Sequence, residues 1–294
     1  MGRAVRPRLG VALLLAAMLA ACGGSDGDGG KGSGATLRVS GSTTVAPVAA
    51  DAAEVLRRQG MDITVDSQGG SAGGIAQLGA HEIEVAMSSK PVTEEEKARY
   101  PAVNFASAEL GADAVAVAVR REVFEGGVKN LGRDQLRALF EGRVRNWSEL
   151  GGPDLAVFVY DKEPGRGTRE VLDRYLYGPD GKAPPPPRTG NYAVVGGNEE
   201  TRAKLVSTPG SVGPLSTAFV AGQPKLAAVA VDGVEPTASN VRDGRYPMSR
   251  PLFFLTDGPP RGAARRFIDF VLSDEGQALV AKHGYLTLAE LSRH

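Results

Sequence analysis

The sequence of 294 residues contains one cysteine, Cys22, and three histidines. A single thiol excludes a disulfide framework, and so few histidines give no indication of a metal cluster. Stability must therefore come from buried apolar side chains. There is also no excess of positive charge, because 34 Lys and Arg residues balance 34 Asp and Glu residues. Nucleic-acid binding requires clustered positive charge, so a nucleic-acid partner is not expected.

No apolar run near the N-terminus is long enough to span a bilayer. Three arginines precede the apolar residues 9–19, a run shorter than the ~20 residues that a membrane-spanning helix requires. The following Leu-Ala-Ala-Cys-Gly at 19–23 resembles a bacterial lipobox, which implies cleavage before Cys22 and a diacylglyceryl group on its thiol. The pattern predicts a lipoprotein signal peptide at 1–21, a flexible tether at 22–35 and an extracytoplasmic protein anchored to the cell membrane.

The expected mature chain is slightly acidic. Without residues 1–21 it has 31 Lys and Arg against 34 Asp and Glu, a formal net charge of −3. A bound anion would therefore have to be held by local dipoles rather than by the field of the whole protein.

Hydrophobic patterning predicts an α/β fold. Strand-like segments at 37–39, 63–65 and 83–87 each lead through a small-residue turn into a helix-like segment. A Thr-Glu-Glu-Glu capping box at 93–96 is typical of the start of another helix. Repeated strand-to-helix units predict a parallel sheet, whose ligands gather at the carboxyl ends of the strands.

A second α/β section is predicted after the fully apolar segment 114–119, which is typical of a buried strand and suits a crossing between two lobes. The further expected elements are helices at 133–140, 169–177 and 261–272, strands at 156–160 and 252–255, and a last helix capped by Ser273.

Four stretches rich in Gly, Ser and Thr occur at 40–44, 68–71, 87–89 and 163–169. Each follows an apolar run. A backbone that turns from strand into helix leaves N–H groups unpaired and directs the positive end of the helix dipole at the turn. Small hydroxyl residues let a tetrahedral oxyanion approach these donors, so the four stretches together predict one anion-binding site.

Five segments carry a family resemblance: 40–47 (SGSTTVAP), 140–147 (FEGRVRNW), 163–169 (EPGRGTR), 243–251 (DGRYPMSRP) and 267–277 (FIDFVLSDEGQ). Together they resemble the phosphate-binding subunit of the phosphate-specific ABC importer, and the match covers essentially all of residues 36–289. The resemblance implies a two-lobed periplasmic-binding-protein fold of type II in residues 36–294, with a hinge and a ligand cleft between the lobes. It also implies lobe 1 at about 36–113 and 223–294, and lobe 2 at about 114–222.

The function implied by this resemblance is capture of inorganic phosphate, or a similar tetrahedral oxyanion, and delivery to an ABC permease. A member of this family uses no cofactor or metal and performs no covalent chemistry. A monomer suits delivery to a transporter.

The resemblance also implies a ligand set of Ser42, Thr43, Ser71, Ser89, Gly167 and Thr168. Lys162 stands where such proteins usually have an arginine, and Arg166 stands where they have a serine, so either cation is a candidate to neutralise the anion. Ser89 stands where some members have an aspartate that accepts the proton of hydrogen phosphate. Discrimination against sulfate is therefore expected to be weaker here.

Two alternatives remain open from the sequence. Gly69–Gly73 matches the G-x-S-x-G turn of serine hydrolases, with Ser71 as nucleophile, Asp257 or Asp269 as acid and His283 as base. The second alternative is a surface oxyanion sensor that binds without transport. Ester turnover would distinguish the hydrolase, and a neighbouring permease and ATPase would favour transport.

Overall fold

The computed structural model describes residues 36–292. The predicted signal peptide at 1–21, the tether at 22–35 and the proposed lipidation site Cys22 lie outside the described residues. Within residues 36–292, no helix has the length and apolar character needed to cross a bilayer.

The described strands form one sheet in the order β2-β1-β3-β10-β4-β8-β6-β7, with β9 beside β4 and β5 beside β9. The strands are β1 (Leu37–Gly41), β2 (Ile63–Asp66), β3 (Val85–Ser88), β4 (Phe105–Arg120), β5 (Asn130–Leu131), β6 (Phe158–Lys162), β7 (Tyr192–Val195), β8 (Ser211–Ser216), β9 (Leu226–Val231) and β10 (Ser249–Asp257).

The sheet is mixed rather than parallel throughout. Strand β1 pairs in parallel with β2 and β3, and β6 pairs in parallel with β7 and β8, as the strand-to-helix units predict. Strand β10, however, runs antiparallel to both β3 and β4. This corrects the expected parallel sheet. A local pattern cannot reveal it, because β10 reaches its partners from the C-terminal part of the chain.

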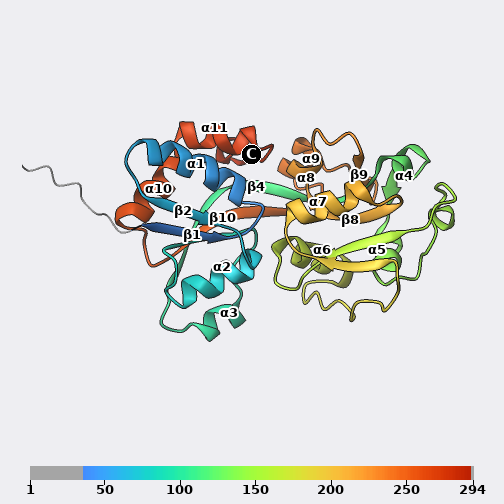
Figure 1. Cartoon of the computed structure of the whole chain (residues 1–294), viewed down its shortest axis with the longest axis horizontal. Helices are drawn as coiled ribbons and strands as arrows, with labels where there is room; N and C mark the ends of the chain where they lie inside the picture. Colours follow the sequence, from blue (N-terminus) through green and yellow to red (C-terminus); the bar gives the residue numbers. More distant parts are fainter. Residues whose placement is uncertain (1–35, 293–294) are drawn as a thin grey trace, which may run out of the picture. The chain divides into compact units, whose positions relative to one another are not determined.

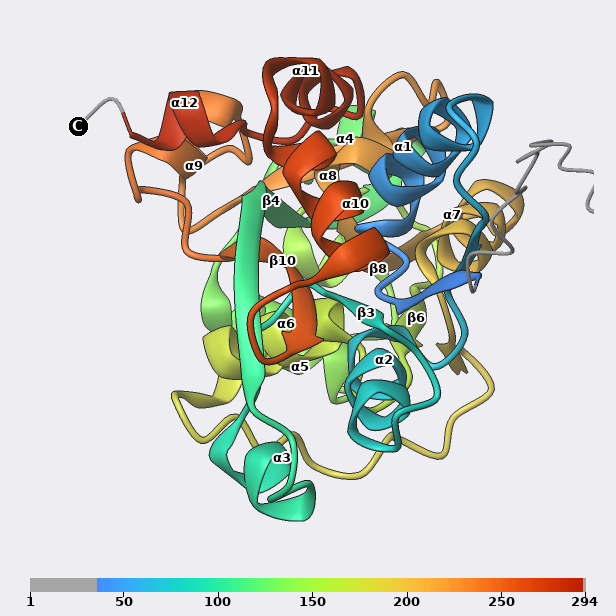
Figure 2. The same cartoon turned by 90° about the vertical axis from the view of Figure 1, so that its left-hand side faces the viewer.

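The described helices are α1 (Ala46–Arg58), α2 (Gly70–Gly79), α3 (Glu94–Arg99), α4 (Arg121–Glu125), α5 (Arg133–Phe140), the 3-10 helix η1 (Trp147–Leu150), α6 (Gly167–Tyr177), α7 (Asn198–Ser207), α8 (Thr217–Val220), α9 (Ala238–Arg242), α10 (Gly262–Leu272), α11 (Asp274–Lys282) and α12 (Leu288–Leu291). Figure 1 shows α1, α10 and α11 on one side of β1, β2 and β10, with α2 and α3 on the other side, and Figure 2 agrees.

Two lobes share the long strand β4. Its first part pairs with β10, whereas residues 115–120 pair with β8 and β9. One buried apolar cluster packs around α1, β1 and α10, and another around α5, η1 and α6. The two lobes therefore have separate cores, joined by strands that continue from one to the other.

The division between the lobes differs from the expected one at residue 223. Strand β9 pairs with the second part of β4, and Val241, Tyr246 and Met248 belong to the apolar cluster around α5 and α6. Residues 226–248 therefore pack with lobe 2 rather than lobe 1. Strand β9 belongs to the sheet of lobe 2, because it pairs with the second part of β4. The chain then returns to lobe 1 along β10, which pairs with the first part of β4.

Two glycines bring α2 close to β1. A Cβ on Gly74 would lie 2.8 Å from the Cα of Gly41, and a Cβ on Gly41 would lie 2.3 Å from the carbonyl oxygen of Met87. Gly41 also has φ +131, a conformation that L side chains rarely adopt. This close packing places the first turn of α2 beside the residues that follow β1.

Candidate functional site

All eight residues predicted as ligands line one cavity: Ser42, Thr43, Ser71, Ser89, Lys162, Arg166, Gly167 and Thr168. Three further residues complete the lining: Thr44 and Gly70, which lie in the predicted turns 40–44 and 68–71, and Gly196, which the sequence did not indicate. The cavity offers 10 Å³ to the centre of a water molecule. It therefore has room for one small ion and none for an organic molecule.

The fold brings these residues together at strand ends. Ser42–Thr44 follow β1, Ser89 follows β3, and Gly70–Ser71 open α2 after β2. From the other lobe, Gly167–Thr168 open α6 after β6. The first N–H groups of a helix have no partner within that helix, so α2 and α6 both present donors and a positive dipole end to the cavity.

Ser71 and Ser89 hydrogen-bond to each other rather than to a base. The backbone N–H of Ser89 donates to Ser71 Oγ at 3.1 Å, and the two hydroxyl oxygens are 3.3 Å apart. His283 instead contacts Asp51, with Nε2 3.0 Å from Oδ2. Asp257 and Asp269 contact His81 and Arg265, respectively. The alternative serine-hydrolase arrangement around Ser71 is therefore not assembled among the described residues.

Lys162 is a buried cation with no carboxylate partner at ion-pair distance within the described residues. Its Nζ donates to Asn198 Oδ1 at 3.2 Å, to the carbonyl of Gly197 at 3.1 Å and to Thr201 Oγ1 at 2.5 Å. Burial lowers the pKa of Lys162 to about 7, and the charges of Arg250 and Arg166 contribute. The three acceptors match the three N–H donors of an ammonium group. Because the pKa is about 7, the ammonium and the amine forms coexist near neutral pH.

Arg166 also lines the cavity, but its charge is balanced. Its Nη2 lies 2.6 Å from Glu163 Oε2, and its side chain is 14% exposed. The side chain lies over Gly70, where an added Cβ would come within 2.7 Å of the Arg166 Cδ. The structure thus places both candidate cations at the cavity, and of these two only Lys162 lacks an anionic partner among the described residues.

Sequence reasoning missed a further buried cation. Arg250 on β10 is 3% exposed and contacts the hydroxyls of Thr44, Ser89 and Thr168. The signals for it in the sequence are its place in segment 243–251, which carries part of the family resemblance, and its position just before the apolar residues 252–255. Its carboxylate partner, Asp113, lies on β4 with Nη2 and Oδ2 2.8 Å apart.

Contacts between the lobes close the cavity. Asn198 Nδ2 donates to Thr44 Oγ1 at 3.0 Å across the cleft. Lys90 in lobe 1 lies 2.8 Å from Glu96 and 3.3 Å from Glu170 of α6. These contacts hold α6 against lobe 1, which is the arrangement needed to enclose a ligand.

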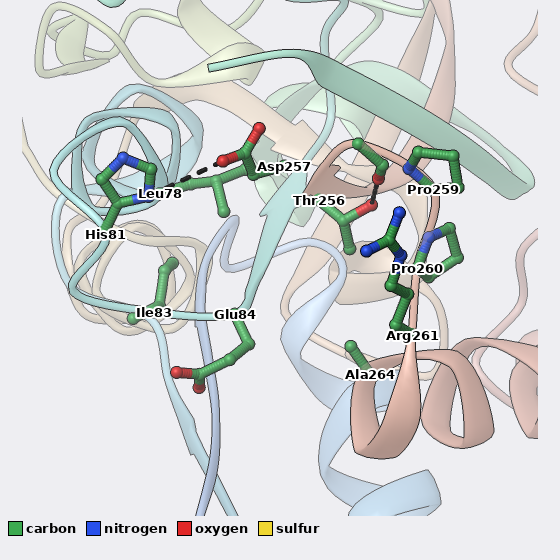
Figure 3. Close-up of a pocket in the computed structure, with 11 residues that line it drawn as sticks. Leu78, His81, Ile83, Glu84, Thr256, Asp257, Pro259, Pro260, Arg261 and Ala264 are labelled. Carbon is green, nitrogen blue, oxygen red and sulfur yellow. Dashed lines mark hydrogen bonds and ion pairs between the residues drawn. The ribbon is translucent and has the colours of Figure 1, made fainter. Parts of the chain in front are cut away.

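A larger surface hollow lies beside α2 and α10 (Figure 3) and offers 390 Å³ to the centre of a water molecule. In it, His81 faces Asp257, with Nδ1 3.7 Å from Oδ2. Glu84 also lines it and is held by Arg38 at 2.6 Å. Arg261 also lines this hollow, but the carboxylates of Glu84 and Asp257 offset its charge, so the hollow suits an anion less well than the cavity does. No group of three or more His, Cys, Asp or Glu residues in the described part of the chain has a metal-binding arrangement.

The family model of the PBP superfamily domain matches residues 26–275. The chain belongs to this superfamily. Among curated PBP relatives, it is 29% identical to the phosphate-binding protein PstS of Bacillus subtilis (strain 168), over 97% of this chain and 95% of the relative.

Solved PBP structures show the same fold. A Clostridium perfringens substrate-binding protein assigned to phosphate ABC transport, solved with bound phosphate, is 29% identical, with a TM-score of 0.76. The alignment covers 86% of this chain and 99% of that one. An ABC-type phosphate transport receptor from Vibrio cholerae is 26% identical, with a TM-score of 0.67, over 85% and 99% of the two chains. The two-lobed periplasmic-binding-protein fold predicted from the sequence is confirmed.

Proposed function

We propose that this protein is an extracytoplasmic solute-binding protein that captures inorganic phosphate for an ABC importer and performs no covalent chemistry. The proposal includes a monomeric protein and a lipid anchor on Cys22, which rests on the lipobox-like sequence at 19–23. The ligands would be the eight lining residues named above, with Thr44 added.

The observation that carries this proposal is the cavity itself. Hydroxyl groups and the N-termini of two helices from separate lobes surround a space for one small ion, and a buried cation lies at its wall. Hydrogen bonds from charged or dipolar donors to an oxyanion are stronger than those between neutral groups. Phosphate as the ion is supported by two relatives that the chain matches over almost their full length: a phosphate-binding protein and a substrate-binding protein solved with bound phosphate.

Binding would proceed by closure of the two lobes. In an open state, phosphate would meet the donors of lobe 1, namely Ser42–Thr44, Ser71 and Ser89. Closure would then add Gly167, Thr168 and Lys162 from lobe 2. The hinge would lie where β4 and β10 cross between the lobes, and contacts such as Lys90 with Glu170 would stabilise the closed form.

Titration calorimetry of the mature chain with phosphate, arsenate, sulfate and molybdate tests the function. We expect one phosphate to bind per chain, and arsenate to bind similarly because its charge and shape are nearly the same. No ester substrate should be turned over, and Ser71→Ala should change no hydrolysis rate. Tighter binding of sulfate than of phosphate, at two pH values, would refute the phosphate assignment.

A further inference from the structure

Arg250 uses all its donors inside the protein. It lies opposite Asp113 in the pairing of β10 with β4, and its Nε and Nη2 donate to Asp113 Oδ2 at 3.2 and 2.8 Å. The other N–H groups reach hydroxyls. Nη1 donates to Thr168 Oγ1 at 2.9 Å and Ser89 Oγ at 3.3 Å, and Nη2 donates to Thr44 Oγ1 at 2.9 Å. These contacts account for the five N–H groups of a guanidinium.

The contacts exclude one direction for each of three hydroxyl hydrogens. For Ser89 this leaves the cavity or Ser71 Oγ, 3.3 Å away. A guanidinium cannot accept a hydrogen bond, so a hydroxyl that accepts from Arg250 must direct its own hydrogen elsewhere. Thr44, Ser89 and Thr168 all line the cavity. Thr44 Oγ1 also accepts from Asn198 Nδ2, which occupies both of its lone pairs and leaves it only a donor's role.

Two other cavity hydroxyls, those of Ser42 and Thr43, each accept one hydrogen bond from a backbone N–H. Ser42 Oγ accepts from the N–H of Thr44 at 3.2 Å, and Thr43 Oγ1 accepts from the N–H of Asn198 at 3.3 Å. Each such contact leaves an O–H free for a ligand. Arg250 differs because one side chain sets three hydroxyls, two in lobe 1 and one in lobe 2.

We propose that Arg250 is a positioning residue for oxyanion binding. Its guanidinium, neutralised by Asp113, orients the hydroxyls of Thr44, Ser89 and Thr168 so that they donate to the anion. The charge of Arg250 reaches the ligand through these hydroxyls rather than by direct contact. This inference rests on the proposed function and adds to the site a residue 82 positions beyond Thr168 in the chain.

The test is a double-mutant cycle with phosphate affinity as the readout. Arg250→Lys keeps the charge beside Asp113, but an ammonium has three donors and cannot serve all the partners of a five-donor fork. We expect Arg250→Lys to weaken phosphate binding by about 30-fold and Thr168→Val by about 10-fold. If Arg250 acts through Thr168, the double variant should lose about 50-fold rather than the roughly 300-fold product.

A second variant tests the role of Arg250 even if Arg250→Lys does not fold. Arg250→Met combined with Asp113→Asn removes both charges together, leaves no unpaired buried carboxylate, and should weaken phosphate binding at least as much as Arg250→Lys. Arg245→Lys, at an arginine whose side chain is 60% exposed, is the matched control and should bind normally.

The outcomes distinguish the role of Arg250 from the proposed function. A folded Arg250→Lys variant with wild-type phosphate affinity would overturn the role of Arg250 and leave the proposed function intact. Fully additive losses in the cycle would overturn the action through Thr168. Absence of phosphate binding by the wild-type chain would instead overturn the proposed function, and this inference with it.

Discussion

Replacing Gly167 with alanine should nearly abolish phosphate binding, with a loss of affinity of at least about 100-fold. A Cβ at this position would lie 2.4 Å from Ser89 Oγ and 3.1 Å from Ser71 Oγ. Both hydroxyls line the cavity, so the methyl group would displace two proposed donors from an enclosed space with room for one ion. Loss of two hydrogen bonds to a charged ligand is worth about 3–6 kcal/mol. Calorimetry with phosphate measures the change.

Gly190→Ala is the matched control. A Cβ added to Gly190 would have no heavy atom within 4 Å, and the residue does not require a positive φ, so this variant should bind phosphate with wild-type affinity. Circular dichroism and thermal unfolding would establish that the Gly167→Ala protein is folded. A folded Gly167→Ala protein that binds phosphate normally would place the anion away from the start of α6.

Replacing Lys162 with methionine should lower phosphate affinity by about 10- to 100-fold while leaving the fold at least as stable. The variant removes a cavity cation that has no carboxylate partner among the described residues. All three N–H groups of the ammonium donate to protein acceptors, so one of them would have to turn from its acceptor to the anion. A charged hydrogen bond in a buried site contributes about 1.5–3 kcal/mol. Without phosphate, the variant should gain folding stability, because burial of the Lys162 ammonium is unfavourable and lowers its pKa from 10.5 to about 7. Lys204→Met, on the exposed face of α7, is the control and should leave affinity unchanged.

The pKa of Lys162 makes both folding stability and phosphate binding depend on pH. Between pH 7 and 10.5 the unfolded chain binds the Lys162 proton and the folded chain does not, so the contribution of Lys162 to stability rises with pH. A bound dianion favours the ammonium form, so at about pH 8.5 phosphate binding should take up close to one proton. Calorimetry in buffers of different ionisation enthalpy measures this uptake. It should vanish in Lys162→Met, and its absence from the wild type would contradict an ionic role for Lys162.

Local patterns predicted much of the scaffold. The helical spacing at 133–140 matches the bounds of α5, and the small-residue turns at 40–44 and 163–169 lie at the cavity. Such signals are visible because the turn residues, the helix starts and the apolar faces are neighbours in sequence. The eight proposed ligands were reached through these turns together with the family resemblance.

The features that the sequence did not predict depend on pairing between residues far apart in the chain. Arg250 lies 161 residues from Ser89, inside a strand with no glycine-rich turn, and only the pairing of β10 with β4 brings it to the cavity. Pairing of β9 with the second part of β4 likewise explains why residues 226–248 belong with lobe 2. Thr44 lies in the predicted turn 40–44, but its contact with Asn198 in the other lobe cannot be seen in a local pattern.

In the proposed function, one phosphate ion occupies the cavity between the starts of α2 and α6. A crystal structure of the mature protein with arsenate, located by its anomalous scattering, would show the position of the bound anion. We expect a single arsenic position enclosed by Ser42, Ser71, Ser89 and Thr168, close to Lys162. An arsenic position elsewhere, for example in the hollow of Figure 3, with the cavity free of arsenate would contradict it.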